Sequence, residues 1–191
     1  MDSASFNNRI FNREDFTTNP LAEGEYEDCR FMNCSFSNTD LSGYRFNDCL
    51  FSGCNLSLVR LHKTAFRNIR FKDCKLTGLH VEDCNEFGLC FSFDNCTLNH
   101  SSFSGLKLRK TVFRNSELKE ADFSNCDLKE SVFDQCDLSR TTFNNTNLEK
   151  ADFRTAYNYS IDPESNRLQK AVFSYPGVLE LLSRYQVIVK D

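Results

Sequence analysis

Long apolar runs are absent from this 191-residue sequence. No segment approaches the roughly eighteen consecutive apolar residues that cross a membrane as a helix. The N-terminus also lacks the basic and then apolar residues of a secretory signal. We therefore expect a soluble, cytoplasmic protein without a membrane partner.

Residues and motifs that usually carry catalysis are equally scarce. The three histidines, His62, His80 and His100, accompany no nucleophile, general base or metal-ligand pattern. The sequence contains no G-x-S-x-G, P-loop, G-x-G-x-x-G or H-E-x-x-H motif. It therefore predicts a protein that is not an enzyme and that holds no cofactor and no metal ion.

What the sequence does contain is a period of five residues. Every fifth residue is large and apolar from Phe31 to Val81, and a second such run extends from Phe93 to Phe153. This period fits neither a helix nor a strand, and identical short units bury their apolar faces only by stacking on one another. In the second run phenylalanine and leucine alternate: Phe93, Leu98, Phe103, Leu108, Phe113, Leu118, Phe123, Leu128, Phe133, Leu138, Phe143, Leu148 and Phe153.

Each five-residue unit combines a short extended step with a corner. The position two before the central Phe or Leu is mostly small or apolar, so two of every five side chains point inward. The position two after the central residue is mostly Asn, Asp or Gly. These residues tolerate a positive φ angle or bond their own backbone, which is typical of a turn.

Units such as residues 121–125, 126–130 and 151–155 resemble the A(D/N)LXX pattern of the pentapeptide-repeat family. The resemblance covers about residues 25–157 and implies an all-β solenoid, a right-handed quadrilateral parallel β-helix. With four units in each coil, central residues twenty apart stack on one another. The predicted core therefore contains Phe93, Phe113, Phe133 and Phe153, Phe103, Phe123 and Phe143, and Leu98, Leu118 and Leu138.

The regularity of the repeat divides the single domain into three parts. Residues 1–24 form a degenerate first coil and N-terminal cap, because Glu14, Asn19 and Gly24 occupy inward positions. Residues 25–157 form the β-helix, with a frame slip and bulge at 82–92, where two residues exceed the period. Residues 158–191 form a C-terminal cap with a turn, a helix at about 176–185, and a last strand at 187–189.

Ten cysteines leave three possibilities open. The spacing of Cys29, Cys34, Cys49 and Cys54 superficially suggests a metal site, and stacked coils could also join thiols as disulfides. Nine of the ten, all but Cys90, fall at or near the inward slot two before a central position. The position in the repeat therefore favours small, buried, free thiols.

Charge provides little indication of a nucleic-acid partner. The net charge is −4, and the basic residues between Arg60 and Lys75 occupy about one coil. They would encircle the rod, whereas phosphate binding needs a basic stripe on one side. We therefore expect no direct nucleic-acid binding.

A rigid rod without catalytic groups favours a binding module that presents its walls to a protein partner. Val112 and Val132, which are twenty residues apart, should form an outward apolar ridge, and Glu86 and Phe87 should project from the bulge. These four residues form the predicted partner surface. An unlikely alternative is an enzyme that uses Glu82, Asp83, Glu86 or Cys90 at the bulge, although a filled β-helix leaves no substrate cavity.

The chain also resembles the quinolone-resistance (Qnr-type) group of the family in residues 12–16, the single frame slip and the apolar C-terminal helix. That resemblance implies a DNA mimic that binds a type II topoisomerase such as gyrase. It also implies a homodimer joined tail to tail through Val178, Leu181, Leu182 and Tyr185. Residues 93–154, however, have a net charge of only −1, so DNA mimicry stays the alternative to a general binding module.

Overall fold

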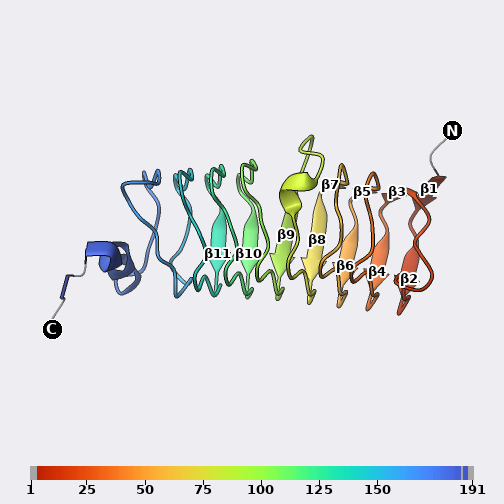
Figure 1. Cartoon of the computed structure of the whole chain (residues 1–191), viewed down its shortest axis with the longest axis horizontal. Helices are drawn as coiled ribbons and strands as arrows, with labels where there is room; N and C mark the ends of the chain where they lie inside the picture. Colours follow the sequence, from red (N-terminus) through yellow and green to blue (C-terminus); the bar gives the residue numbers. More distant parts are fainter. Residues whose placement is uncertain (1–3, 186, 189–191) are drawn as a thin grey trace.

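The structure is a computed structural model that describes residues 4–185 and 187–188. It is a rod of stacked coils whose two ends carry the two termini (Figure 1). Its strands are β1 (Ala4–Asn7), β2 (Ile10–Asn12), β3 (Gly24–Glu27), β4 (Arg30–Met32), β5 (Arg45–Asn47), β6 (Leu50–Ser52), β7 (Ala65–Arg67), β8 (Ile69–Lys72), β9 (Phe91–Asp94), β10 (Val112–Arg114) and β11 (Val132–Asp134). Two short 3₁₀-helices, η1 (Val81–Asp83) and η2 (Gly177–Tyr185), complete the elements.

The strands form two parallel sheets on different sides of the rod. One sheet has the order β1-β3-β5-β7, and we call this side the four-strand wall. The other has the order β2-β4-β6-β8-β9-β10-β11, and we call this side the seven-strand wall. Isolated parallel bridges such as Ser35↔Asn55 and Ser102↔Asp122 stack the remaining two sides. The predicted four-sided parallel β-helix is therefore confirmed.

The interior is filled by the central residues of the repeats. The ring centroid of Phe113 lies 5.2 Å from that of Phe93 and 4.9 Å from that of Phe133, with nearly parallel planes. Rings on opposite sides meet edge to face, as Phe113 and Phe123 do at 5.7 Å, which is a favourable aromatic geometry. The ten predicted core side chains are between 0 and 5% exposed.

In many units the inward slot two before the central residue holds a small side chain that donates a hydrogen bond. The Cys49 thiol donates to the carbonyl of Tyr26 at 3.3 Å, and the Thr141 hydroxyl donates to that of Leu118 at 2.7 Å. Both acceptors lie 23 residues earlier, in the preceding coil. Cys, Ser and Thr share this slot because each is small and carries a donor, whereas other units fill it with an apolar side chain such as Val59 or Ala121. Nine of the ten free cysteines are buried and Cys90 is exposed.

Corner residues adopt the left-handed backbone conformation. Asn33 has a φ of 54° and Asp48 a φ of 54°, a region that Asn and Asp enter at low cost. Their amides point along the rod, and the N–H of Asn33 donates to the carbonyl of Ser52 in the next coil at 2.8 Å. Each corner therefore turns the chain and links two coils.

The first coil is more regular than the sequence predicts. β1 pairs with β3 from Ala4↔Gly24, and β2 pairs with β4 in the same twenty-residue register. Gly24 is required at its inward position, because a Cβ atom there would lie 2.3 Å from the carbonyl oxygen of Ala4. The irregular part of this coil is confined to the segment around Pro20.

The coil also continues past residue 157, where the sequence pattern predicts its end. Parallel bridges join Asp152 to Val172, and the ring of Phe173 stacks on that of Phe153 at 5.3 Å. Tyr159 and Ile161 are buried inside this last coil, although neither lies at a five-residue interval from Phe153. The five-residue period is therefore not visible in this part of the sequence.

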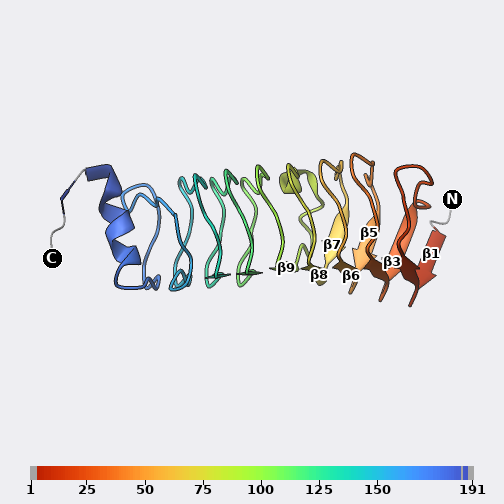
Figure 2. The same ribbon diagram turned by 90° about the horizontal axis from the view of Figure 1, so that it is seen from below.

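Helix η2 lies across the C-terminal end of the rod, where the sequence predicts a helix at about 176–185 (Figure 2). The predicted last strand is wrong for the two of its residues that are described, because Val187 and Ile188 are exposed and form no ladder. Val189 lies outside the described residues. No helix in the described part of the chain is sufficiently long and apolar to cross a membrane.

Candidate partner-binding walls

The outer surface of the seven-strand wall carries a short apolar ridge. Val112 of β10 pairs in register with Val132 of β11, and both side chains are half-buried. Two residues further along the same strands, the Arg114 guanidinium lies 3.2 Å from the Asp134 carboxylate. Such an exposed ion pair contributes at most about 1 kcal/mol, so its effect is mainly to hold polar groups beside the ridge.

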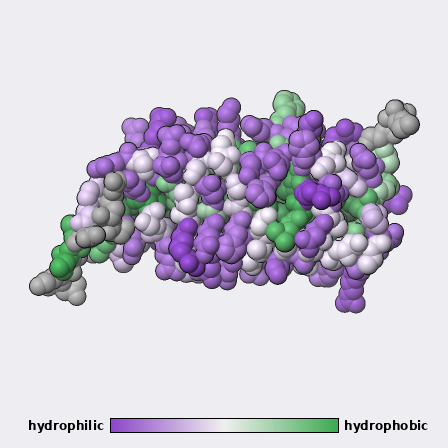
Figure 3. Space-filling view, viewed as in Figure 1, coloured by the Kyte–Doolittle hydropathy of each residue, from purple (hydrophilic) through white to green (hydrophobic). Residues whose placement is uncertain are grey.

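Shallow recesses lie on both sides of this ridge. One, of about 300 Å³, is lined by residues that include Leu50, Ser92 and Val112. The other, of about 370 Å³, is lined by residues that include Val132 and Asp152. In the space-filling view, pale and green atoms form interrupted patches among hydrophilic purple ones (Figure 3). The ridge and its recesses offer shape and apolar area to a partner.

The bulge predicted at 82–92 is a loop that projects from the rod after η1 (Figure 1). Backbone hydrogen bonds to the preceding coil follow the twenty-residue register up to Asn85. They resume at Cys90 in a register of twenty-two residues. The two extra residues therefore lie between Asn85 and Cys90. Glu86 and Phe87 are exposed there, and the Phe87 side chain is 80% exposed.

Contacts with Asn85 of the loop and with Arg67 of β7 hold the Phe87 side chain in its outward position. The Phe87 amide donates to the side-chain oxygen of Asn85 at 2.9 Å. The guanidinium of Arg67 lies 5.6 Å from the centre of the Phe87 ring, a cation–π distance, and its Nε donates to the Phe87 carbonyl at 3.5 Å. Phe87 is thus an ordered projection, although it precedes β9 and is separate from the valine ridge of β10 and β11.

The residues considered for catalysis at the bulge do not form a constellation. The Nδ1 of His80 lies 3.1 Å from the Oε1 of Glu82. Glu86 and Cys90 are exposed in the loop. No hydrogen bond or ion pair joins Glu82, Asp83, Glu86 and Cys90 to one another within residues 4–185. In the same range no group of three or more His, Cys, Asp or Glu side chains could hold a metal ion.

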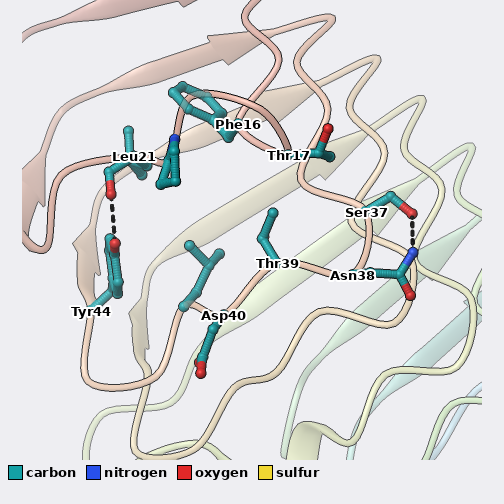
Figure 4. Close-up of a pocket in the computed structure, with 10 residues that line it drawn as sticks. Phe16, Thr17, Leu21, Ser37, Asn38, Thr39, Asp40 and Tyr44 are labelled. Carbon is teal, nitrogen blue, oxygen red and sulfur yellow. Dashed lines mark hydrogen bonds between the residues drawn. The ribbon is translucent and has the colours of Figure 1, made fainter.

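A recess of about 410 Å³ lies near the N-terminal end, between the first two coils (Figure 4). Its polar groups already have partners: the Tyr44 hydroxyl donates to the Leu21 carbonyl at 2.6 Å, and the Ser42 amide donates to the Asp40 carboxylate at 2.9 Å. Hydrogen bonds from Ser42 lower the pKa of Asp40, which disfavours it as a proton donor. The sequence signal for this recess is Pro20, which interrupts the first coil.

The C-terminal end presents a second apolar surface. The side chains of Tyr175 and Ile188 are 88% and 84% exposed, and that of Leu182 in η2 is 39% exposed. Among the residues predicted to form a dimer, Leu181 packs against the core, whereas Val178, Leu182 and Tyr185 are exposed. The Tyr185 hydroxyl donates to a carboxylate oxygen of Glu164 at 2.8 Å. The end of the rod is therefore covered by η2, whose outer face is apolar.

Comparison with known proteins identifies the repeat. The family model of the pentapeptide repeat region matches residues 25–91 and 87–153. No curated protein sequence matches the chain.

Solved structures share the fold at low sequence identity. A trypsin-treated variant of QnrB1, a plasmid-mediated fluoroquinolone resistance protein, is 18% identical with a TM-score of 0.66, over 98% of this chain and 97% of that chain. A second trypsin-treated QnrB1 variant is 20% identical with a TM-score of 0.50, over 98% of both chains. HetL, a pentapeptide repeat protein involved in heterocyst differentiation regulation in the cyanobacterium Nostoc sp. strain PCC 7120, is 15% identical with a TM-score of 0.49, over 91% of this chain and 86% of that chain.

Proposed function

Because the chain belongs to the pentapeptide-repeat family, we propose that it is a non-enzymatic binding module that presents rigid β-helix walls to a protein partner. The interior is occupied by stacked rings and small side chains, so recognition is left to the outer surface. In the recess near the N-terminal end, Asp40 and Tyr44 are already hydrogen-bonded to other groups of the protein.

The observation that carries this proposal is the in-register pair Val112 and Val132. Two β-branched side chains stand side by side on a regular sheet, with recesses on either side and an ion pair along one edge. Apolar centres with polar rims are the usual anatomy of a protein interface. A regular sheet also keeps this surface in one conformation, which lowers the entropic cost of binding.

Affinity capture with matched variants tests the proposal. The double variant Val112→Glu, Val132→Glu places two charges on the ridge, and Ser102→Glu, Thr142→Glu places the same charge on the opposite wall. We expect at least one protein to be captured from cell lysate by the parent and by the control, but not by the ridge variant. Capture of no reproducible protein, or equal capture by all three, contradicts the proposal.

A more specific candidate is binding to a type II topoisomerase such as gyrase. Its support is the likeness in fold to the fluoroquinolone resistance protein QnrB1 along almost the whole chain. A supercoiling assay with purified gyrase, with and without a fluoroquinolone, tests it at micromolar protein. Inhibition of supercoiling or protection from the drug supports this partner. The absence of both effects rejects gyrase as the partner and leaves the broader proposal intact.

We further propose that two rods join tail to tail into a homodimer through the C-terminal end. Tyr175, Val178, Leu179, Leu182 and Ile188 leave an apolar surface there that a second copy would cover. Exposed apolar area of this kind on a small protein is typical of an interface.

A further inference from the structure

A basic surface is assembled on the side of the rod that continues the four-strand wall. Residues 107–110, 127–130, 147–150 and 167–170 occupy the same position in four successive coils, stacked by the bridges Lys107↔Asp127, Asp127↔Asn147 and Asn147↔Arg167. We call these four segments the basic wall. Its seven cations are Lys107, Arg109, Lys110, Lys129, Lys150, Arg167 and Lys170, against three carboxylates, Asp127, Glu130 and Glu149.

The carboxylates of the basic wall lie beneath its cations. Lys110 is 77% exposed, whereas Glu130, 3.7 Å away, is 35% exposed and is also 3.7 Å from Lys150. Arg109 likewise covers Asp127, and Glu149 is mostly buried beside Lys129. No ion pair in the described part of the chain engages Lys107, Arg167 or Lys170. The outermost layer of the wall is therefore positive, and three of its cations are available to a partner.

The basic wall adjoins the valine ridge. Lys110 is the corner residue that precedes Val112, and Glu130 is the corner residue that precedes Val132. The corner row of Lys110, Glu130, Lys150 and Lys170 thus borders the apolar ridge along its length. A ligand that covers both surfaces would need acidic side chains on one flank and apolar side chains on the other.

The limited extent of the basic wall favours a short acidic protein segment over a nucleic acid. Four coils at a spacing of about 4.8 Å extend over about 14 Å. The wall has an excess of four positive charges in a chain whose net charge is −4, so the rest of the chain has a net charge of −8. A duplex, with one charge for about every 1.7 Å, would extend beyond the wall onto a surface that is acidic on balance.

We propose that the basic wall binds an acidic segment of the protein partner, with apolar side chains of that segment on the Val112–Val132 ridge. This inference rests on the proposed protein-binding function and specifies the chemistry of the partner. It does not depend on the partner being a topoisomerase.

Fluorescence anisotropy tests the inference with a labelled peptide of four Glu-Glu-Leu repeats, its Gln-Gln-Leu counterpart, and a short DNA duplex. The wall variant is Lys107→Glu, Arg167→Glu, Lys170→Glu. The control is Arg13→Glu, Lys63→Glu, Lys75→Glu, which has the same net charge but changes residues outside the basic wall, the valine ridge and its recesses. All six side chains are exposed, so we expect both variants to fold.

The acidic peptide should bind the parent and the control with similar affinity, and bind the wall variant at least about tenfold more weakly. The neutral peptide should bind none of them. Equal loss in both variants, absence of saturable binding to the parent, or tighter binding of the duplex than of the peptide overturns the inference. If the acidic peptide does not bind but a protein is still captured through the valine ridge, the proposed function stands and only the inference about the basic wall fails. The two tests therefore distinguish the two proposals.

Discussion

Phe71 stacks on Phe93 with ring centroids 5.3 Å apart, although the two residues are twenty-two positions apart in the sequence. Phe51 and Phe71 before them, and Phe93 and Phe113 after them, stack at the twenty-residue interval. The two extra residues are thus absorbed by the loop between Asn85 and Cys90, and the aromatic stack passes through the slip without interruption. The loop is therefore an addition to the coil.

Removing the slip should preserve the fold. Replacing residues 86–90 by Leu-Cys-Gly would create a regular unit, Cys84-Asn85-Leu-Cys-Gly, and restore the twenty-residue period. We expect the free energy of unfolding, measured by urea denaturation, to change by less than about 1 kcal/mol, because short surface loops contribute little to stability. Loss of cooperative unfolding would show instead that the loop is part of the core.

Phe123→Ala should be strongly destabilising. The ring is fully buried between Phe103 at 4.7 Å and Phe143 at 5.5 Å, so the cavity cannot close easily. We expect a loss of about 3–5 kcal/mol in chemical denaturation. Phe87→Ala, which removes an exposed ring, is the control and should change stability by less than about 0.5 kcal/mol. A loss below about 1 kcal/mol for Phe123→Ala would refute the stacked interior.

Alkaline pH should destabilise the protein through its buried thiols. Burial raises the pKa of Cys49, Cys84, Cys126 and Cys136 from the usual 9.0 to about 12. Between these values the unfolded chain releases protons that the native protein retains, so stability is full below pH 9 and falls as pH rises toward 12. Urea denaturation under reducing conditions at increasing pH measures this slope.

Cys126→Ser provides the matched control for the alkaline effect. Serine occupies the same slot at Ser131, where its hydroxyl donates to the carbonyl of Leu108, so the substitution keeps a donor and removes one titrating group. The decline in stability should be shallower in this variant. Stability that stays constant from pH 8 to pH 11 would contradict the burial of the thiols.

Leu182→Asp should separate the proposed dimer. Leu182 is on the outer face of η2, where a charge would be buried by a second copy, and light scattering should report a monomer. Leu58→Asp alters an exposed leucine on the side of the rod, where we expect the dimer to persist. If the parent is itself monomeric, the tail-to-tail arrangement is wrong.

The sequence predicts the interior well because a five-residue period specifies it locally. The phenylalanine and cysteine positions follow from the repeat, and the fold follows from the need to stack identical units. The last coil escapes this reasoning, because Tyr159 and Ile161 fill it from irregular positions and conceal that Phe173 continues the stack.

The outer surface is far less predictable, because its neighbours are distant in sequence. Lys107, Arg167 and Lys170 form one basic surface only after coils of twenty residues are stacked, and a charge count along the chain averages them with acidic residues of other walls. Contacts such as Arg67 on Phe87 likewise depend on how the inserted loop folds back on the previous coil. The candidate site therefore depends on the structure, whereas the core does not.

Counting reactive thiols is the most direct test of the central claim that rings and thiols fill a closed coil and leave only its walls for recognition. With a thiol reagent at pH 8, we predict one rapid reaction in the native protein, at Cys90, and ten reactive thiols after unfolding in denaturant. The Cys90→Ser variant should lose the rapid phase. Several native thiols reacting at once, or fewer than ten after unfolding, would contradict the account.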